Sequence, residues 1–325
     1  MAREKHDRPP LTENAAQRSE NDMHPLTTGQ CATLACLWEV SIPKPGNVHR
    51  GADFEDLTFY DFVNSAIAIE PAMNAAAQRG LGETILDAVR ATQACVATNT
   101  NLGTILLLAP LAMAADQHQR EERASDAYRA SLTEVLGSLT AEDAALTYEA
   151  IRLANPGGMG EVEEMDLAEA PPNDLMSAMQ AARERDLVAR QYCENFAQLL
   201  EFAVPSIESG LEAGWTLPQS VVHAHLRLMA TWPDSLIARK CGEPTAREAA
   251  ARANVPLEAD GPLDNNYQRG VADLDFWLRS DGHRRNPGTT ADMIAASLFV
   301  LLRQGRIGPS VMSGREGLAT DGVSE

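Results

Sequence analysis

The chain has 325 residues, enough to bury a full hydrophobic core, and a formal net charge of −19. Its residues are 44% hydrophobic but only 5% aromatic, which favours closely packed helices over a β-sandwich. The negative charge argues against sequence-independent binding of DNA, RNA or an anionic membrane, because each requires a basic surface. For a polyanionic small molecule, basic residues would have to be concentrated at the site, with help from a divalent metal ion.

The cysteine content and the N-terminus indicate the compartment. Five cysteines occur without a Cys-x-x-Cys pair, and we interpret them as buried thiols in a reducing cytosol: Cys31, Cys36, Cys95, Cys193 and Cys241. The N-terminus lacks an apolar signal region, and the longest apolar run, residues 102–115, is too short to span a bilayer. We therefore expect a soluble, cytoplasmic protein.

The order of segments predicts one all-α domain. Residues 1–25 are polar and aperiodic and are expected to be a disordered tail, and residues 306–325 a flexible C-terminal tail. Between them, residues 26–305 show helical periodicity and no useful period-two alternation, which predicts a multi-helix bundle. Helices are expected at residues 28–40, 56–78, 83–98, 102–115, 124–136, 140–153, 175–202, 205–213, 218–231, 245–253, 263–279 and 289–303.

Three local features stand out in this bundle. The segment 102–115 is apolar on every side, which predicts a helix at the centre of the domain. Thr140 is the expected N-cap of the 140–153 helix, with Asp143 completing an acidic capping box. The glycine-rich segment after Asn155 opens a loop of about twenty residues, which is uncommon inside a compact domain and often functional.

The first chemistry-bearing stretch runs from Glu39 to Asp53. It contains Pro43-Lys44-Pro45-Gly46, and because proline removes a backbone donor, the chain is expected to leave the first helix as a stiff turn. Lys44 and Arg50 on this turn, with acidic residues on both sides, would suit a metal-bound polyphosphate. The alternative is an ordinary connection between two helices with solvated charges.

Three further segments combine polar residues with a helix start. Asn99 to Gly103 precedes the central helix and predicts either an anion-binding helix end or a simple cap. Asp234, followed by Arg239 and Lys240, fits a metal–phosphate site or an N-cap. Asp292 lies in the first turn of the last helix, where a carboxylate complements the helix dipole.

The glycine-rich loop and a histidine pair complete the candidates. Gly157 and Gly158 would allow close approach of the backbone to a ligand, with Glu161 as a base or metal ligand, although such loops are more often turns. His223 and His225 lie about 200° apart on a helix and cannot easily share one ion, so no metal is assigned to them.

In the same order along the chain, these segments resemble the motifs of the triphosphoribosyl-dephospho-CoA synthase family. The matching blocks are Pro43-Lys-Pro-Gly46, Asn99-Thr-x-x-Gly103, Asp234-Ser with the downstream Arg239, and Pro287-Gly-x-x-Ala-Asp292. The resemblance spans roughly residues 30–305. This chain departs from the family pattern at Asn101-Leu102, where the family has His-Lys, and at Met159, where it has arginine.

The resemblance implies a transferase that uses ATP as a ribosyl donor. A hydroxyl of dephospho-CoA attacks C1′ of the ATP ribose, adenine leaves, and the triphosphate stays attached. It implies small-molecule partners, ATP and dephospho-CoA or another cofactor precursor, together with Mg²⁺; no nucleic acid or membrane is expected, and a homodimer is compatible with it.

The residues expected to carry this chemistry fall into three groups. The acid–base candidates are Glu39, Asp53 and Glu161. The Mg²⁺ candidates are Glu39, Asp234 and Asp292. The candidates for binding ATP are Lys44, Pro45, Gly46, Arg50, Asn99, Thr100, Gly103, Gly157, Gly158, Arg239, Lys240 and Gly288.

Two other functions remain open at this stage. One is ATP-dependent ribosyl or phosphoribosyl transfer onto another cofactor precursor, such as a methanopterin-type one-carbon carrier. The other is a non-catalytic, ATP-binding sensor that kept the pocket and lost the chemistry. Release of free adenine from ATP separates the two enzymes from the sensor.

Overall fold

The structure is a computed structural model that describes residues 26–117, 125–155 and 174–313. The N-terminal half contains α1 (Thr28–Ser41), α2 (Phe59–Ala68), α3 (Glu70–Asn74), α4 (Ala76–Arg79), α5 (Leu81–Cys95), α6 (Leu102–Gln117), α7 (Ser125–Gly137) and α8 (Ala141–Ala154). The C-terminal half contains α9 (Leu175–Ala182), α10 (Leu187–Cys193), a π-helical turn η3 (Leu199–Ala203), α11 (Val204–Glu212), α12 (Leu217–Thr231), α13 (Ser235–Cys241), α14 (Glu243–Leu257), α15 (Asn265–Arg279), the extended segment β1 (Ser280–His283), α16 (Gly288–Arg303) and a 3₁₀ turn η4 (Pro309–Ser313).

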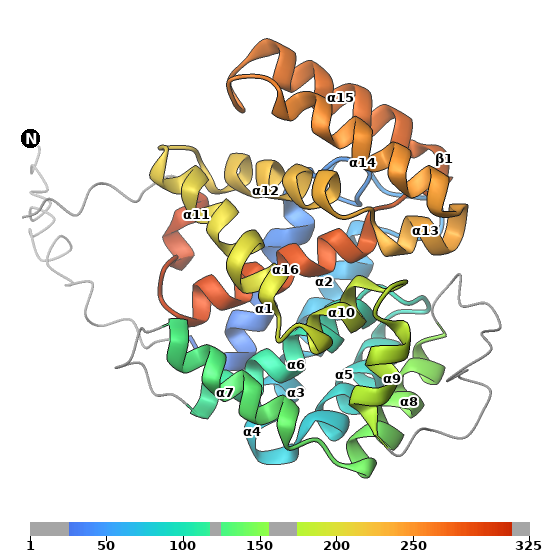
Figure 1. The fold of residues 1–325 in the computed structure, drawn as a ribbon, viewed down its shortest axis with the longest axis vertical. Coiled ribbons are helices and arrows are strands. Elements are labelled where there is room, and N and C mark those ends of the chain that lie inside the picture. Colours follow the sequence, from blue (N-terminus) through green and yellow to red (C-terminus); the bar gives the residue numbers. More distant parts are fainter. Residues whose placement is uncertain (1–25, 118–124, 156–173, 314–325) are drawn as a thin grey trace, which may run out of the picture.

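Helices α6 and α16 form the centre of the bundle (Figure 1). α6 packs against α1, α5, α7 and α16, and its side chains at Ile105, Leu107 and Leu108 are fully buried on different sides of the helix. α16 packs against α1, α6 and α12. The expected all-α single domain with a central apolar helix is therefore confirmed.

A second, smaller cluster of buried side chains joins α12, α13, α14 and α15 at one end of the molecule (Figure 1). Leu226 and Met229 of α12 meet Ile237 of α13 and Leu274 of α15 there. α13 thus packs on α14 and also touches α16, so it links the two clusters. The start of α13 thereby lies against the start of α16, where Ser235 Oγ donates to Thr289 Oγ1 at 3.0 Å.

Two of the expected long helices are broken into shorter ones. The segment 56–78 forms α2, α3 and α4, because Pro71 starts a new helix near the end of the previous one. The segment 175–202 forms α9, α10 and η3, because Asp186 caps a new helix and Asn195 and Phe196 have left-handed backbone conformations. Helical periodicity alone does not show such breaks.

Other local expectations can be checked directly. Thr140 caps α8, and its capping box with Asp143 is present as predicted. The packed chain extends past residue 305, because Ile307 is only 6% exposed and lies in the main core. Residues 1–25, predicted as a disordered tail, and the later part of the predicted C-terminal tail lie outside the described residues.

Cysteine exposure and membrane-spanning potential can also be compared with the sequence. All five thiols are free, but Cys95 is exposed, so the expectation that every cysteine is buried is wrong. Within the described ranges, none of the helices combines the length and the apolarity needed to cross a membrane.

Candidate active site

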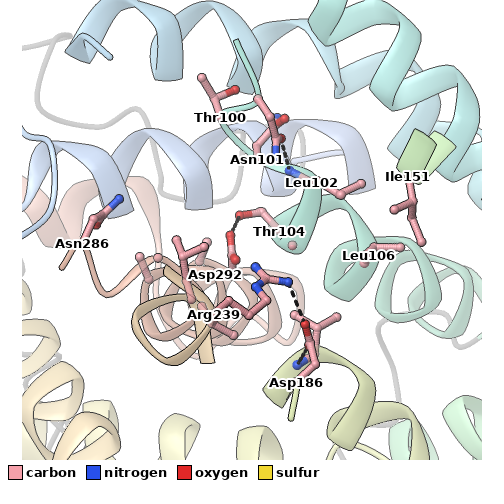
Figure 2. Close-up of a pocket in the computed structure, with 18 of the residues that line it drawn as sticks. Thr100, Asn101, Leu102, Thr104, Leu106, Ile151, Asp186, Arg239, Asn286 and Asp292 are labelled. Atoms are coloured by element: carbon pink, nitrogen blue, oxygen red, sulfur yellow. Dashed lines mark hydrogen bonds and ion pairs between the residues drawn. The ribbon is translucent and has the colours of Figure 1, made fainter. Parts of the chain in front are cut away.

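A cavity of about 720 Å³ lies between α1, α6, α8, α9, α10, α13 and the N-terminus of α16 (Figure 2). Its wall toward α6 and α10 is apolar, with Leu102, Leu106 and Val188. Its other side carries polar and charged residues from α1, α13 and α16. A deep, mixed cavity of this volume is typical of a small-molecule site.

The cavity brings together residues from three of the four matching blocks, and Glu39 from the stretch that contains the fourth. Eight of the predicted site residues line it: Glu39, Asn99, Thr100, Gly103, Arg239, Lys240, Gly288 and Asp292. Six others are described but do not line it: Lys44, Pro45, Gly46, Arg50, Asp53 and Asp234. Gly157, Gly158 and Glu161 lie outside the described residues.

Asp292 occupies the middle of the cavity wall, and in Figure 2 its side chain and that of Thr104 point toward each other. Thr104 Oγ1 donates a hydrogen bond of 2.5 Å to Asp292 Oδ1. Burial, with a smaller effect from the nearby carboxylate of Glu39, raises the pKa of Asp292 to about 8, although the Thr104 hydrogen bond acts in the opposite direction. At neutral pH this carboxyl group is therefore mostly protonated.

Glu39 reaches the same cavity from the end of α1, in a different environment. Its Oε1 lies 2.8 Å from Nζ of Lys44, and its side chain is 11% exposed whereas that of Lys44 is 0% exposed. Lys44 turns away from the cavity toward the C-terminal carbonyl groups of α1. The expected contact of Lys44 with phosphate therefore has no support in this geometry.

Asp234 caps two helices at once. Its Oδ1 accepts hydrogen bonds from the backbone N–H groups of Leu236 and Ile237 at the start of α13, at 2.9 and 3.0 Å. Its Oδ2 accepts from the backbone N–H and the hydroxyl of Thr290 at the start of α16, both at 2.8 Å. The N-cap interpretation is confirmed. Because both oxygens are engaged and the side chain is buried outside the cavity lining, the Mg²⁺ role is not supported.

The turn after α1 serves to dock the chain against α15 and the start of α16. Gly46 has φ +77°, and an added Cβ would lie 2.8 Å from Leu278, so this position requires glycine. Its N–H donates to Asp275 Oδ1 at 2.8 Å, and Asn47 Nδ2 donates to Asn286 Oδ1 at 2.7 Å. Asn47 and Asn286, which are not among the predicted site residues, thereby become part of the cavity wall.

The remaining residues of the opening motif lie farther out. Arg50 and Asp53 are exposed, and Asp53 Oδ1 accepts a hydrogen bond of 2.6 Å from the backbone N–H of Phe59 at the start of α2. Pro45 is buried outside the cavity lining. The structure thus places Asp53 at the start of α2. Among the described residues, no hydrogen bond or ion pair joins Asp53 to Glu39 or Asp292.

Basic side chains gather at the cavity despite the acidic composition. Arg239 pairs with Asp186 at 3.1 Å across the cavity (Figure 2), and burial lowers the pKa of the neighbouring Lys240. Arg152 and Arg185 also line the cavity, from the end of α8 and the turn before α10. These two arginines were missed, because only the packing of α8 beside α9 brings them to the site.

At the start of α6, capping is confirmed as one role of the predicted anion-binding end. Asn99 Oδ1 accepts a hydrogen bond of 3.1 Å from the backbone N–H of Leu102. The hydroxyl of Thr100 is 2.6 Å from that of Ser65 in α2. Both Asn99 and Thr100 nevertheless line the cavity, so a ligand can lie against this helix end.

The described residues do not fit a protein-held Mg²⁺ site. They contain no group of three or more His, Cys, Asp or Glu side chains placed to share an ion. The carboxyl groups that line the cavity are already engaged: Glu39 with Lys44, Asp186 with Arg239, and Asp56 with His283 at 2.8 Å. Asp292 Oδ1 is likewise engaged, because it accepts the hydrogen bond of Thr104.

Comparison with known proteins decides the family. Residues 25–309 match the family described as ATP:dephospho-CoA triphosphoribosyl transferase (CitG). The chain belongs to this family. As a member it is a transferase, and its reaction is ATP-derived triphosphoribosyl transfer to dephospho-CoA.

A solved structure agrees with this assignment. The transferase is similar to a crystal structure from Archaeoglobus fulgidus assigned as a triphosphoribosyl-dephospho-CoA synthase. The two are 25% identical with a TM-score of 0.56, and the similarity covers 74% of this chain and 98% of the other. No curated protein matches the chain in sequence.

Proposed function

We propose that the cavity is where this transferase moves the triphosphoribosyl group from ATP to dephospho-CoA, with Glu39 and Asp292 as its acid–base pair. One observation carries the proposal: two carboxyl groups face the same cavity in different environments. Glu39 is paired with a buried ammonium ion, whereas burial keeps Asp292 mostly protonated at neutral pH. We take the protonated Asp292 as the acid and the ion-paired Glu39 as the base.

The proposed step is a displacement at C1′ of the ATP ribose. Glu39 accepts the proton of the acceptor hydroxyl as that oxygen bonds to C1′, and the bond from C1′ to the adenine nitrogen breaks. The bonding pair leaves with adenine, and Asp292 donates the proton that the departing base requires. The step leaves Glu39 protonated and Asp292 ionised, and exchange of one proton through the cavity restores both.

The two carboxyl groups also suit the charge that develops at the sugar. Ribosyl transfer passes through an oxocarbenium-like state, which a neighbouring carboxylate stabilises. Glu39, which forms the ion pair with Lys44, can supply that stabilisation. Thr104 fixes the other member, because its hydroxyl holds one oxygen of Asp292 and leaves the second oxygen without that bond.

We assign the triphosphate to the basic side of the cavity. Arg239 and Lys240 come from the last turn of α13, close to the start of α16. Arg239 offers a planar fork of donors suited to phosphate oxygens, and Lys240 adds a compact charge. Arg152 and Arg185 lie at the α8 and α9 side of the cavity and suit the diphosphate of the acceptor.

Magnesium enters this proposal only as a companion of ATP. Since the described residues offer no cluster of ligands, we propose that the ion is held mainly by the triphosphate oxygens, as is common for Mg²⁺. No proton transfer is assigned to it. ATP binding measured with and without excess chelator tests this: chelator should weaken binding, and unchanged binding would leave the basic residues to hold the phosphates alone.

The function itself is tested by product analysis. The protein is incubated with ATP and Mg²⁺, with and without dephospho-CoA, and free adenine is measured together with the mass of any adduct. Adenine should form only with the acceptor, alongside a triphosphoribosyl adduct. If adenine forms only with a pterin-type precursor, that precursor and not dephospho-CoA is the acceptor. If ATP binds but no acceptor yields adenine, the protein is an ATP-binding sensor.

A further inference from the structure

We propose that Lys44 is a positioning residue, which pairs with the carboxylate of Glu39 and aims it into the cavity without touching substrate. The inference rests on the proposed role of Glu39 as the base. It departs from the phosphate-binding role that the opening motif suggests, and three features of the structure carry it.

The first feature is that every donor of the Lys44 ammonium ion is accounted for. Nζ donates to Ile42 O at 3.2 Å and to the backbone oxygen of Glu39, and lies 2.8 Å from Glu39 Oε1. An ammonium group has three N–H donors, so none is left for a phosphate oxygen. All three acceptors belong to the last turn of α1 and the residue that follows it.

The second feature is the difference in burial between the two partners. Lys44 is fully buried and does not line the cavity, whereas Glu39 does. An ion pair shielded from water interacts more strongly than one at the surface. The positive charge of Lys44 therefore acts on the Glu39 carboxylate, and of these two groups only the carboxylate faces a ligand in the cavity.

The third feature is the rigid environment of Lys44, which keeps its charge beside Glu39. Pro43 and Pro45 restrict the backbone on both sides of Lys44. His225 of α12 is fully buried, and burial together with the Lys44 charge holds the pKa of this imidazole well below its usual range. A neutral ring at this position adds no second charge that would compete for Glu39.

The test is a double-mutant cycle on adenine release with Lys44→Met, Glu39→Gln and the double variant. Glu39→Gln should lower kcat by about 10²-fold to 10⁴-fold, as loss of a general base does. Lys44→Met should lower kcat by at least about tenfold with KM for ATP unchanged. In the Glu39→Gln background, Lys44→Met should cost nothing further.

Two outcomes would overturn the inference while leaving the function in place. One is a raised KM for ATP at unchanged kcat, which would put Lys44 on the phosphates. The other is an equal loss of kcat in both backgrounds, which would mean that Lys44 does not act through Glu39. If Lys44→Met does not fold, the double variant, in which both partners are neutral, is compared with Glu39→Gln: equal activity supports the inference, and a further loss contradicts it.

Failure of the proposed function would look different. Wild-type protein that releases no adenine with any acceptor would remove the reaction, and the inference about Lys44 would fall with it. Wild-type kcat in Glu39→Gln would remove the base and therefore the positioning role. Both results are independent of any measurement on Lys44 variants.

Discussion

Gly103 of α6 and Asp292 of α16 are in such close contact that no side chain fits between them. A Cβ atom added to Gly103 would overlap Asp292 Oδ2 and lie 2.7 Å from its Cγ atom. The two central helices therefore approach each other at the carboxyl group that we assign as the acid. This contact explains why glycine is required at the start of the central helix.

The first prediction concerns this contact. Gly103→Ala should displace Asp292 from Thr104 and lower kcat at least about tenfold, with a loss of stability of about 1–3 kcal/mol from overpacking. Gly137→Ala in α7 is the matched control, because a Cβ there meets nothing within 4 Å. Adenine release and thermal unfolding measure both effects. Full activity in Gly103→Ala would show that the contact is irrelevant to catalysis.

The second prediction is the pH dependence of catalysis. Asp292 acts as an acid only while protonated, so kcat should fall as the pH rises through about 8. Asp292→Asn keeps the size of the side chain but removes the proton donor, and should lower kcat about 10²-fold to 10⁴-fold without this basic limb. A basic limb that persists unchanged in Asp292→Asn would have to belong to another group.

The third prediction is the effect of the same carboxyl group on stability. Its pKa is raised in the folded state from the ordinary 3.8 to about 8, so the folded protein binds the extra proton over this interval. The contribution of Asp292 to the free energy of unfolding is fully present below about pH 4 and is lost as the pH rises toward 8. Denaturant unfolding at several pH values should show this slope in wild type and a smaller one in Asp292→Asn. Identical slopes would mean that Asp292 titrates normally.

The fourth prediction concerns Asp234, which caps α13 and α16 together. Asp234→Ala should destabilise the protein by about 1–4 kcal/mol, because each cap contributes about 0.5–2 kcal/mol. Asp264→Ala is the control, since Asp264 caps α15 alone and should cost about half as much. Urea unfolding gives the comparison. Equal costs for the two variants would show that the second cap adds nothing.

The sequence predicted the helical bundle and half of the site for a physical reason. Helical periodicity reports which face of a segment is buried. A helix that is apolar on every side has to be buried all round, so the central helix at 102–115 could be found directly. Cap chemistry is also local, which is why Thr140 and Asp143 were predicted correctly. Asp292 and Gly103 could be singled out from their segments, but not their contact, because that depends on the packing of α6 against α16.

The direction of the Lys44 side chain was beyond the reach of the sequence. The prolines predict a stiff turn, but a stiff turn can present its lysine outward or inward. The structure shows it turned inward because the carbonyl groups at the end of α1 and the Glu39 carboxylate accept its donors. Arg152 and Arg185 were missed for a similar reason, since their segments meet only in the folded chain.

The most direct test of the central claim is single-turnover adenine release from ATP in the presence of dephospho-CoA, measured for wild type, Glu39→Gln and Asp292→Asn. Wild type should release one adenine for each triphosphoribosyl adduct formed. Both variants should still bind ATP, but the rate of adenine release should fall by at least about 10²-fold. Adenine release at the wild-type rate in both variants would contradict the assignment of Glu39 and Asp292 as the acid–base pair.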